Sequence, residues 1–163
     1  MYLVSACLAG INCKYDGENN YNEDIMELVK KGEAILICPE QLGGLATPRF
    51  PSEVSMQNGE RKVINNHGED VTKNYERGAQ EALELGKRLN IKKAILKAKS
   101  PSCGCGLIYD GTFSKKKIEG NGVTAQLLLD NGFEVFNEEN FKKGIIKKNS
   151  SSHYWYTTIY MVY

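Results

Sequence analysis

Three of the five cysteines in the chain lie at or just beyond the ends of predicted β-strands. The three pairs of strand and cysteine are residues 2–6 with Cys7, residues 34–37 with Cys38, and residues 94–98 with Cys103. In an open parallel α/β sheet, the carboxyl ends of the strands border one crevice, and ligands bind there. We therefore expect the three thiols to meet in one place. Three thiolates with one coordination position left open suit a metal or cluster site that performs chemistry.

Each of these cysteines also has an ordinary alternative, because free cysteine is among the most often buried residue types. A structural zinc site needs four closed ligands, commonly in C-x2-C pairs, whereas the local spacings here are C-x5-C and C-x-C. Iron–sulfur clusters are also held by thiolates, and three thiolates on a four-iron cluster leave one iron free. We expect Cys13 and Cys105 to lie outside the ligand set, although Cys105 could replace Cys103.

Polar residues flank the cysteines at short spacings. Glu40 lies two residues beyond Cys38, and a carboxylate in the crevice can act as a general acid or base; the alternative is a solvated loop glutamate. Ser100 and Ser102 lie close before Cys103. Their hydroxyls could hydrogen-bond cluster sulfurs or a substrate, or could simply form a turn.

Other charged residues have less specific interpretations. Arg49 could hold an acidic group or a carbonyl, or it could pair with Glu53. His67, beside Gly68, is expected in a turn. The lysine runs are expected on solvated faces, with weak contacts to RNA phosphates as the alternative; they lie at 115–117, 142–143 and 147–148.

The elements that position these residues alternate between strands and helices. Predicted helices cover residues 23–31, 73–89 and 124–131, and a last strand at 134–136 precedes a last helix from 138 or 139 to about 147. This alternation predicts one α/β, Rossmann-like domain over residues 1–149 with a mostly parallel central sheet.

Residues 39–72 interrupt this pattern because they are rich in proline and glycine. Within them only residues 61–65 have strand character, in a hairpin expected to close near 66–68. Long irregular segments in a compact domain are uncommon and usually functional. We interpret this segment as a lid or substrate-binding loop over the strand ends.

Composition sets wide bounds. The chain has 163 residues, 41% apolar and 25% charged, with a net charge of +1, so a strongly phosphate-directed nucleic-acid binder is not indicated. The start lacks the pattern of a secretory signal, and no apolar run is long enough for a bilayer, so we expect a cytoplasmic protein with reduced thiols and no membrane partner. The uncharged aromatic tail, residues 150–163, could be an edge strand, a homodimer contact or a non-native cloning remnant.

Four motifs in order resemble a known bacterial family that includes thiouracil desulfidases (TudS-like proteins). They are VSACLAGINCKYDG from Val4, CPEQLGGLATPR from Cys38, GEDVT from Gly68 and KSPSCGCG from Lys99. The resemblance extends from residue 1 to about residue 136. It implies non-redox desulfuration of a thiolated pyrimidine of the 2-thiouracil or thiouridine type, with release of sulfide.

The same resemblance implies a role for individual residues. It implies an oxygen-sensitive 4Fe-4S cluster held by Cys7, Cys38 and Cys103, whose free iron takes the substrate sulfur. It also implies that Glu40 is the proton shuttle, assisted by Ser100 or Ser102. The chain offers no separate RNA-binding domain, which favours a small thiolated base or nucleoside over intact tRNA as the partner.

Two rival functions remain open at this level. The first is a non-catalytic iron–sulfur or metal binder, such as a sensor or sulfur carrier, which would not need a carboxylate such as Glu40 in the crevice. The second is a cysteine-nucleophile hydrolase, which would need a histidine beside a cysteine. The chain has only His67 and His153, one in a predicted turn and one in the tail.

Overall fold

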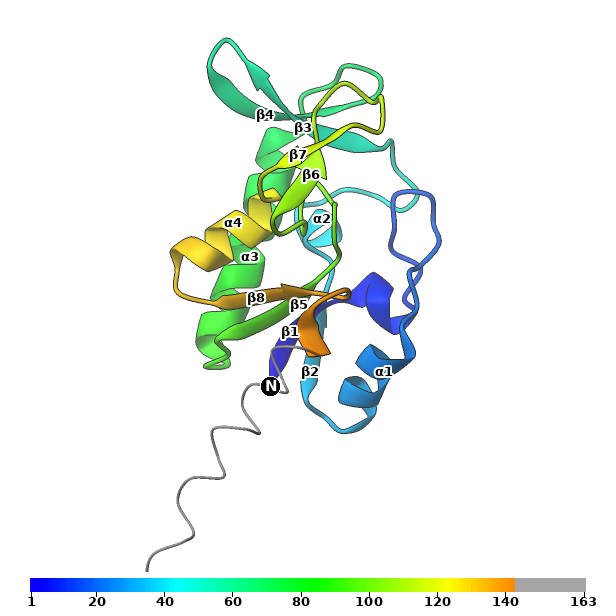
Figure 1. The fold of residues 1–163 in the computed structure, drawn as a ribbon, viewed down its shortest axis with the longest axis vertical. Coiled ribbons are helices and arrows are strands. Elements are labelled where there is room, and N and C mark those ends of the chain that lie inside the picture. The colour runs from blue at the N-terminus through cyan, green and yellow to red at the C-terminus, as the bar shows by residue number, and fades with distance from the viewer. Residues whose placement is uncertain (143–163) are drawn as a thin grey trace, which may run out of the picture.

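Four parallel strands form the central sheet of the computed structural model, which describes residues 1–142 (Figure 1). They are β1 (Tyr2–Ser5), β2 (Ala34–Ile37), β5 (Lys93–Leu96) and β8 (Glu134–Asn137), in the order β2-β1-β5-β8. The predicted α/β class with a mostly parallel sheet is confirmed. Rossmann-like describes it loosely, because the central sheet within residues 1–142 has four strands.

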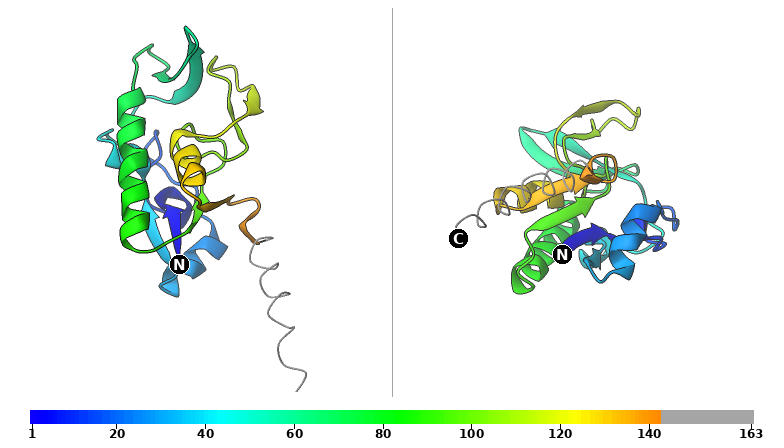
Figure 2. Two further views of the ribbon diagram at one scale, coloured as in Figure 1. Left: turned by 90° about the vertical axis from the view of Figure 1, so that its left-hand side faces the viewer. Right: turned by 60° about the horizontal axis from the view of Figure 1, so that its bottom comes forward.

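Alternation along the strands sends side chains to two separate cores, since successive side chains in a strand point to opposite faces. Leu3 packs on one face against α3 (Thr72–Arg88) and α4 (Val123–Asp130). The next residue, Val4, packs on the other face with Ile25 and Leu28 of α1 (Glu23–Lys30). Helices therefore cover both faces of the sheet, and α3 runs beyond it toward the hairpins (Figure 2).

The predicted helices are confirmed to within one residue at each end. Local chemistry explains the start of α1, where the side chain of Asn22 accepts a hydrogen bond from the backbone N–H of Ile25 at 3.2 Å. Most of the predicted last helix, and the tail at 150–163, lie outside the described residues. In the described part of the chain, no helix has the length and apolar character to cross a membrane.

The strand order creates a crevice between β1 and β5. From β1 the chain continues through α1 to β2 on one side. From β5, the other neighbour of β1, the chain continues through α4 to β8 on the opposite side. Connections therefore leave these two neighbouring strands in opposite directions. In open α/β sheets this switch point, at the carboxyl ends of the strands, is where ligands bind.

Residues 39–72 are more regular than predicted. They contain the short helix α2 (Pro39–Leu42) and two antiparallel strands, β3 (Ser52–Gln57) and β4 (Glu60–Asn65). The hairpin closes at Asn58 and Gly59, both with positive φ, which the sequence analysis did not predict. The predicted turn at 66–68 is also present after β4: the chain returns antiparallel, with a bridge between Ile64 and Asp70. The Asn-Gly pair is a strong hairpin signal, because its residues tolerate the left-handed backbone that such turns need.

A second hairpin lies beside the first at the end of the molecule away from the N-terminus (Figure 1). It pairs β6 (Leu107–Tyr109) with β7 (Lys117–Glu119) in antiparallel register. Beyond β6, residues 110–116 form the loop that connects the two strands.

Two glycines let α2 approach the backbone of α3. A Cβ on Gly43 would lie 1.9 Å from the carbonyl oxygen of Asn74, and a Cβ on Gly78 would lie 1.8 Å from that of Pro39. Any side chain at either position would separate the two helices. Because α2 follows directly on Cys38 and carries Glu40, this close contact helps to position both residues.

Candidate functional site

The three strand-end cysteines line one cavity of about 450 Å³. Cys7 lies in the 3-10 helix η1 (Ala6–Ala9) that follows β1, and Cys38 lies between β2 and α2. Cys103 lies in the turn region after β5. The predicted meeting of these side chains at the carboxyl end of the sheet is thus what the structure shows.

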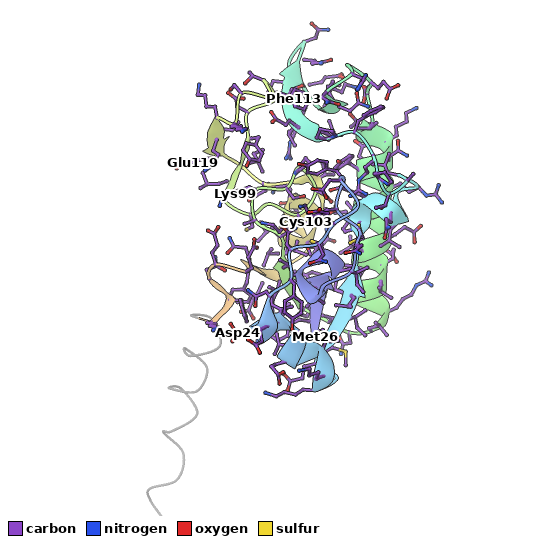
Figure 3. The ribbon with its side chains drawn as sticks, turned by 90° about the vertical axis from the view of Figure 1, so that its right-hand side faces the viewer. Asp24, Met26, Lys99, Cys103, Phe113 and Glu119 are labelled. Carbon is purple, nitrogen blue, oxygen red and sulfur yellow. The ribbon has the colours of Figure 1, made fainter. Side chains whose placement is uncertain are left out.

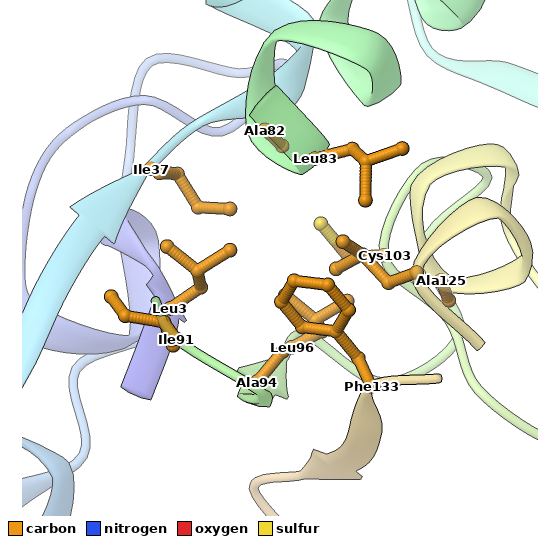
Figure 4. Packing of buried hydrophobic residues seen from close by; sticks show 11 residues of the cluster. Leu3, Ile37, Ala82, Leu83, Ile91, Ala94, Leu96, Cys103, Ala125 and Phe133 are labelled. Atoms are coloured by element: carbon orange, nitrogen blue, oxygen red, sulfur yellow. The ribbon is translucent and has the colours of Figure 1, made fainter. Parts of the chain in front are cut away.

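Cys103 is the most enclosed of the three thiols. It lies in the interior between the sheet and the hairpins (Figure 3) and packs in the core with Leu3, Ile37 and Leu83 (Figure 4). Burial raises the pKa of its thiol to about 12, although a hydrogen bond with Ser5 acts in the opposite direction. The Ser5 hydroxyl also accepts the backbone N–H of Lys97 at 2.9 Å, which ties β1 to the end of β5.

Cys7 and Cys38 have the opposite tendency, because hydrogen bonds favour their thiolates. The pKa of Cys38 is lowered to about 7, chiefly by the side chain of Cys13 and further by the backbone N–H of Gln41 at the start of α2. The pKa of Cys7 is lowered as well, first by Cys13 and then by Asn20. These two thiols are therefore suited to bind a soft cation.

Cys13, expected to lie outside the ligand set, is the fourth thiol in the wall of the cavity. Its side chain is hydrogen-bonded to both Cys38 and Cys7, and these contacts raise the pKa of Cys13. Cys13 thus keeps its proton and acts as the donor. Cys105, in contrast, packs against the core under α3 and α4 and does not line the cavity.

Glu40 and Arg49 form a buried ion pair in the same wall. Arg49 Nε donates to Glu40 Oε2 at 2.6 Å. The side chain of Arg49 is only 8% exposed and that of Glu40 only 14%. Burial alone would lower the pKa of Arg49, but the neighbouring carboxylate outweighs it and raises the pKa. Arg49 also donates to the carbonyl oxygen of Cys13 at 2.9 Å. The alternative of a solvated Glu40 is therefore wrong.

The alternative pairing of Arg49 with Glu53 is also not what the structure shows. Glu53 Oε2 instead accepts the backbone N–H groups of Gly111 and Phe113, each at 3.0 Å, and so links the β3 strand to the loop between β6 and β7. Glu53 still lines the cavity, about 9% exposed.

Tyr75, on α3, is a residue of the site that the sequence analysis did not identify. It is only 2% exposed, and its hydroxyl is hydrogen-bonded to Glu40 and Ser52. Burial and the negative charge of Glu40 raise its pKa, so the hydroxyl remains a donor. Its position in an apolar helical stripe carries no signal of this contact.

Lys97, at the end of β5, is a second such residue. Its ammonium group pairs with Glu138, beyond β8, and donates to the carbonyl oxygen of Ala98 at 3.1 Å. Glu138 Oε2 also accepts the backbone N–H of Ala98 at 2.8 Å, which holds this pair at the sheet end. The sequence signal that could have identified it is a lysine directly after the apolar residues of a strand.

The two serines before Cys103 have different environments. Ser100 lines the cavity, and its Oγ accepts the backbone N–H groups of Ser102 and Cys103 at 3.1 and 3.0 Å. The Ser102 hydroxyl shares a 2.9 Å hydrogen bond with that of Thr124, and both side chains are buried away from the cavity. The geometry therefore favours Ser100 as the serine that faces a ligand.

No histidine of the described residues reaches the thiols. The ring of His67 stacks on Phe50 with 3.9 Å between centroids, in the exposed turn after β4, and His153 lies outside the described residues. Of the lysine run at 115–117, all three side chains are exposed, and Lys115 borders the cavity.

The donor set of the cavity suits an iron–sulfur group. The thiols of Cys7, Cys38 and Cys103 border one open volume. An iron–sulfur cluster is held by several thiolates on separate irons, so these residues are the kind of ligand that such a cluster needs. Among residues 1–142, no three Cys, His, Asp or Glu side chains form a site for a single metal ion.

Comparisons with known proteins agree with this geometry. The 2-thiouracil desulfurase family matches residues 2–140 of the chain. An uncharacterised Bacillus subtilis protein, YbbK, is 48% identical over 144 residues, which cover 85% of this chain and 95% of the relative. A solved structure of a 4Fe-4S-dependent thiouracil desulfidase, TudS, has a TM-score of 0.83 and 39% identity, and the match covers 91% of this chain and 97% of that one.

Proposed function

Because the chain belongs to the 2-thiouracil desulfurase family, we propose that it is an enzyme that removes sulfur from a small thiolated pyrimidine. The net reaction replaces a C=S group by C=O: one water is consumed, one hydrogen sulfide leaves, and no electrons are transferred. One structural observation supports this proposal above all. Three thiols and the buried Glu40–Arg49 pair border the same cavity.

The cysteines supply the proposed cofactor site. We assign Cys7, Cys38 and Cys103 as the ligands of a 4Fe-4S cluster, supported by their common cavity and by the cluster dependence of the similar desulfidase. When bound, such a cluster supplies a Lewis-acidic iron for which a thiocarbonyl sulfur is a suitable soft donor. Cys103 must lose its proton for this, because a thiol binds metal as the thiolate.

Glu40 is the proposed proton shuttle. Its carboxylate can accept a proton from the water that attacks the carbon and can return it to the departing sulfur, so that the proton count balances. Arg49 and Tyr75 hold this carboxylate from two sides, which orients it and limits its rotation. Both partners are donors, and an ionised carboxylate can accept about four hydrogen bonds, so Glu40 has acceptor capacity left for the proton of a water.

Ser100 is the proposed assisting hydroxyl. It lies in the cavity wall beside Cys103, where its oxygen already accepts two backbone N–H groups. Its own hydroxyl hydrogen is then available to donate to a substrate atom. Ser102 has no such part in this proposal, because its hydroxyl is used by Thr124.

The size of the cavity favours a small substrate. About 450 Å³ is within the common range of small-molecule sites, roughly 300–1,000 Å³. A pyrimidine base or nucleoside fits this volume. Lys14 and Lys115 also line the cavity, and their ammonium groups can donate hydrogen bonds to such a ligand.

An anaerobic preparation tests the proposal directly. The purified or reconstituted protein should be brown, contain iron and acid-labile sulfide, and release sulfide from 2-thiouracil or 4-thiouridine. A loaded cluster without sulfide release from either compound would favour the sensor or sulfur carrier. A protein that takes up no iron under reconstitution would overturn the cofactor assignment.

A further inference from the structure

The cavity that contains the three thiols is also lined by four aromatic side chains: Tyr15, Tyr75, Tyr109 and Phe113. They differ in how much ring surface they leave for a ligand. Tyr75 is only 2% exposed, and the ammonium group of Lys14 lies over the ring of Tyr15 at 5.9 Å from its centroid. Phe113 is 39% exposed, and in the described part of the chain no aromatic ring stacks on it and no cation lies over it. Its ring therefore offers apolar surface to a ligand.

Phe113 lies in the loop between β6 and β7, with a backbone conformation that is unusual for its residue type. Its φ is 58°, in the left-handed region, where a bulky side chain is an outlier. Such conformations persist only where the surrounding structure holds them, and they cluster at ligand-binding sites. The position of Phe113 is therefore set by the loop and not by its own conformational preference.

Hydrogen bonds within the loop hold this conformation. The backbone N–H of Asp110 donates to the carbonyl oxygen of Lys116 at 3.1 Å, which closes the loop at its base. Asp110 Oδ1 accepts the backbone N–H of Thr112 at 3.0 Å, and the hydroxyls of Thr112 and Ser114 share a hydrogen bond of 2.7 Å. The residues on both sides of Phe113 are thus tied to each other, and its side chain is held in place before a ligand binds.

The thiols and the ring of Phe113 border different parts of the same cavity. Cys103 lies in the interior between the sheet and the hairpins, whereas Phe113 lies among the hairpins (Figure 3). A thiolated pyrimidine whose sulfur is directed to the thiols extends its flat ring toward the hairpins. An aromatic side chain is a suitable partner for such a ring, because bases stack on aromatic rings with little dependence on their substituents.

We propose that Phe113 is a specificity-determining residue that stacks on the ring of the thiolated pyrimidine, so that the cavity selects planar thiocarbonyl compounds over saturated ones. This inference rests on the proposed function. The thiols alone do not make this choice, since every thiocarbonyl group offers the same soft sulfur. A ring that stays stacked throughout the reaction contributes equal binding to the ground state and the transition state, which lowers KM and leaves kcat unchanged.

The experiment compares the parent with Phe113→Ala, Phe113→Leu, Phe113→Tyr and Ile118→Ala, all reconstituted anaerobically with matched iron content. Alanine removes the side chain, leucine keeps apolar volume without a ring, and tyrosine keeps the ring. Ile118 is the matched control, because it lies on β7 of the same hairpin, is 42% exposed and does not line the cavity. Thermal unfolding shows whether each variant is folded.

Three ligands separate the contact with the ring from the contact with the sulfur. Sulfide release is measured from 2-thiouracil and from dihydro-2-thiouracil, which has the same thiocarbonyl group on a saturated, non-planar ring. Uracil has the planar ring without the sulfur, so its binding, measured by calorimetry, reports the stacking contact independently of turnover.

We expect Phe113→Ala to raise KM for 2-thiouracil and Kd for uracil about 5- to 150-fold, the range for the loss of one base–aromatic stack. Phe113→Leu should behave similarly, Phe113→Tyr should restore the parent values, and Ile118→Ala should not change them. For all variants, kcat for 2-thiouracil and KM for dihydro-2-thiouracil should stay close to those of the parent.

Other outcomes overturn the inference. An unchanged KM and an unchanged uracil affinity in Phe113→Ala and Phe113→Leu, beside a parent that releases sulfide, overturn this inference alone. An equal rise of KM for both thiocarbonyl compounds would mean a shifted loop or a general apolar contact and not a stack. A cluster-loaded parent that releases no sulfide from 2-thiouracil or 4-thiouridine would overturn the proposed function and this inference together.

Discussion

Replacement of Glu40 by glutamine tests the centre of the proposed chemistry. Glutamine has the same shape, and its amide oxygen can still accept the Arg49 N–H that Glu40 accepts at 2.6 Å. It cannot exchange a proton with water. If Glu40 is the shuttle, turnover should fall roughly 100- to 10,000-fold, the usual contribution of general acid–base assistance.

The structure also predicts a stability cost, which must be separated from the loss of turnover. The side chain of Arg49 is only 8% exposed and that of Glu40 only 14%. The variant removes the negative charge of Glu40 and leaves the buried positive charge of Arg49 without its partner. Three further acceptors remain for Arg49: the carbonyls of Cys13 and Ala46, and the Thr47 hydroxyl. We therefore expect a loss of about 1–3 kcal/mol in the free energy of unfolding, as for one weakened buried hydrogen bond to a charged group.

These two magnitudes differ enough to be told apart. A 100- to 10,000-fold loss of rate corresponds to about 2.7–5.4 kcal/mol in the barrier. A domain with the usual unfolding free energy of roughly 5–15 kcal/mol remains more than about nine-tenths folded after the expected stability loss. Unfolding therefore cannot produce a hundredfold loss of activity at 25 °C.

The assay measures sulfide release from 2-thiouracil and 4-thiouridine by reconstituted proteins with matched iron content, together with thermal unfolding. Glu53→Gln is the matched control, because Glu53 is a second largely buried carboxylate in the same wall but binds only backbone N–H groups. The control should keep turnover within a few-fold of the parent. If Glu40→Gln also does so on both substrates, Glu40 is not the shuttle, and Ser100 or a held water takes that role.

Three further predictions concern the cysteines and the contact between α2 and α3. Cys103→Ala should abolish cluster loading, measured as iron and sulfide after reconstitution; loading at the parent level would remove Cys103 from the ligand set. In the cluster-free protein, the rate of alkylation of Cys38 by iodoacetamide should be half-maximal near pH 7 and should fall about tenfold per pH unit below it. The reason is that the lowered pKa of Cys38 keeps its thiol ionised down to about pH 7. The rate is measured by peptide mapping with mass spectrometry, and a midpoint near pH 9 would contradict the assigned hydrogen bonds. Gly78→Ala places a Cβ 1.8 Å from the carbonyl oxygen of Pro39. We therefore expect the free energy of unfolding to fall by about 1–3 kcal/mol, measured by thermal unfolding, and turnover to fall because α2 shifts. Unchanged stability and turnover would show that this helix contact does not position Glu40.

The sequence by itself was sufficient for the architecture and for the meeting of the three thiols. Helix and strand periodicities are local properties, and they predicted the ends of α1, α3 and α4 to within one residue. The parallel arrangement then follows from the alternation of strands and helices. Because parallel strands end at one edge of the sheet, residues that follow different strands must lie near each other, as Cys7 and Cys38 do.

Sequence reasoning failed where a local signal was given too little weight. The Asn58–Gly59 pair closes the β3–β4 hairpin, but the sequence analysis identified only the second turn, at 66–68. β3 itself has alternating but largely polar residues, which masks its strand character. Both errors arise within residues 39–72, where proline and glycine obscure the periodicity.

Only the tertiary structure decided which polar groups face the cavity. Arg49 pairs with Glu40 and not with Glu53, Ser100 and not Ser102 lines the wall, and Tyr75 and Cys13 enter the site. Each choice depends on contacts between segments far apart in the chain and on the direction of a side chain at a turn. Residue spacing determines which strand end a side chain follows, but hydrogen bonds to buried partners, whose burial exists only in the folded chain, determine where it points.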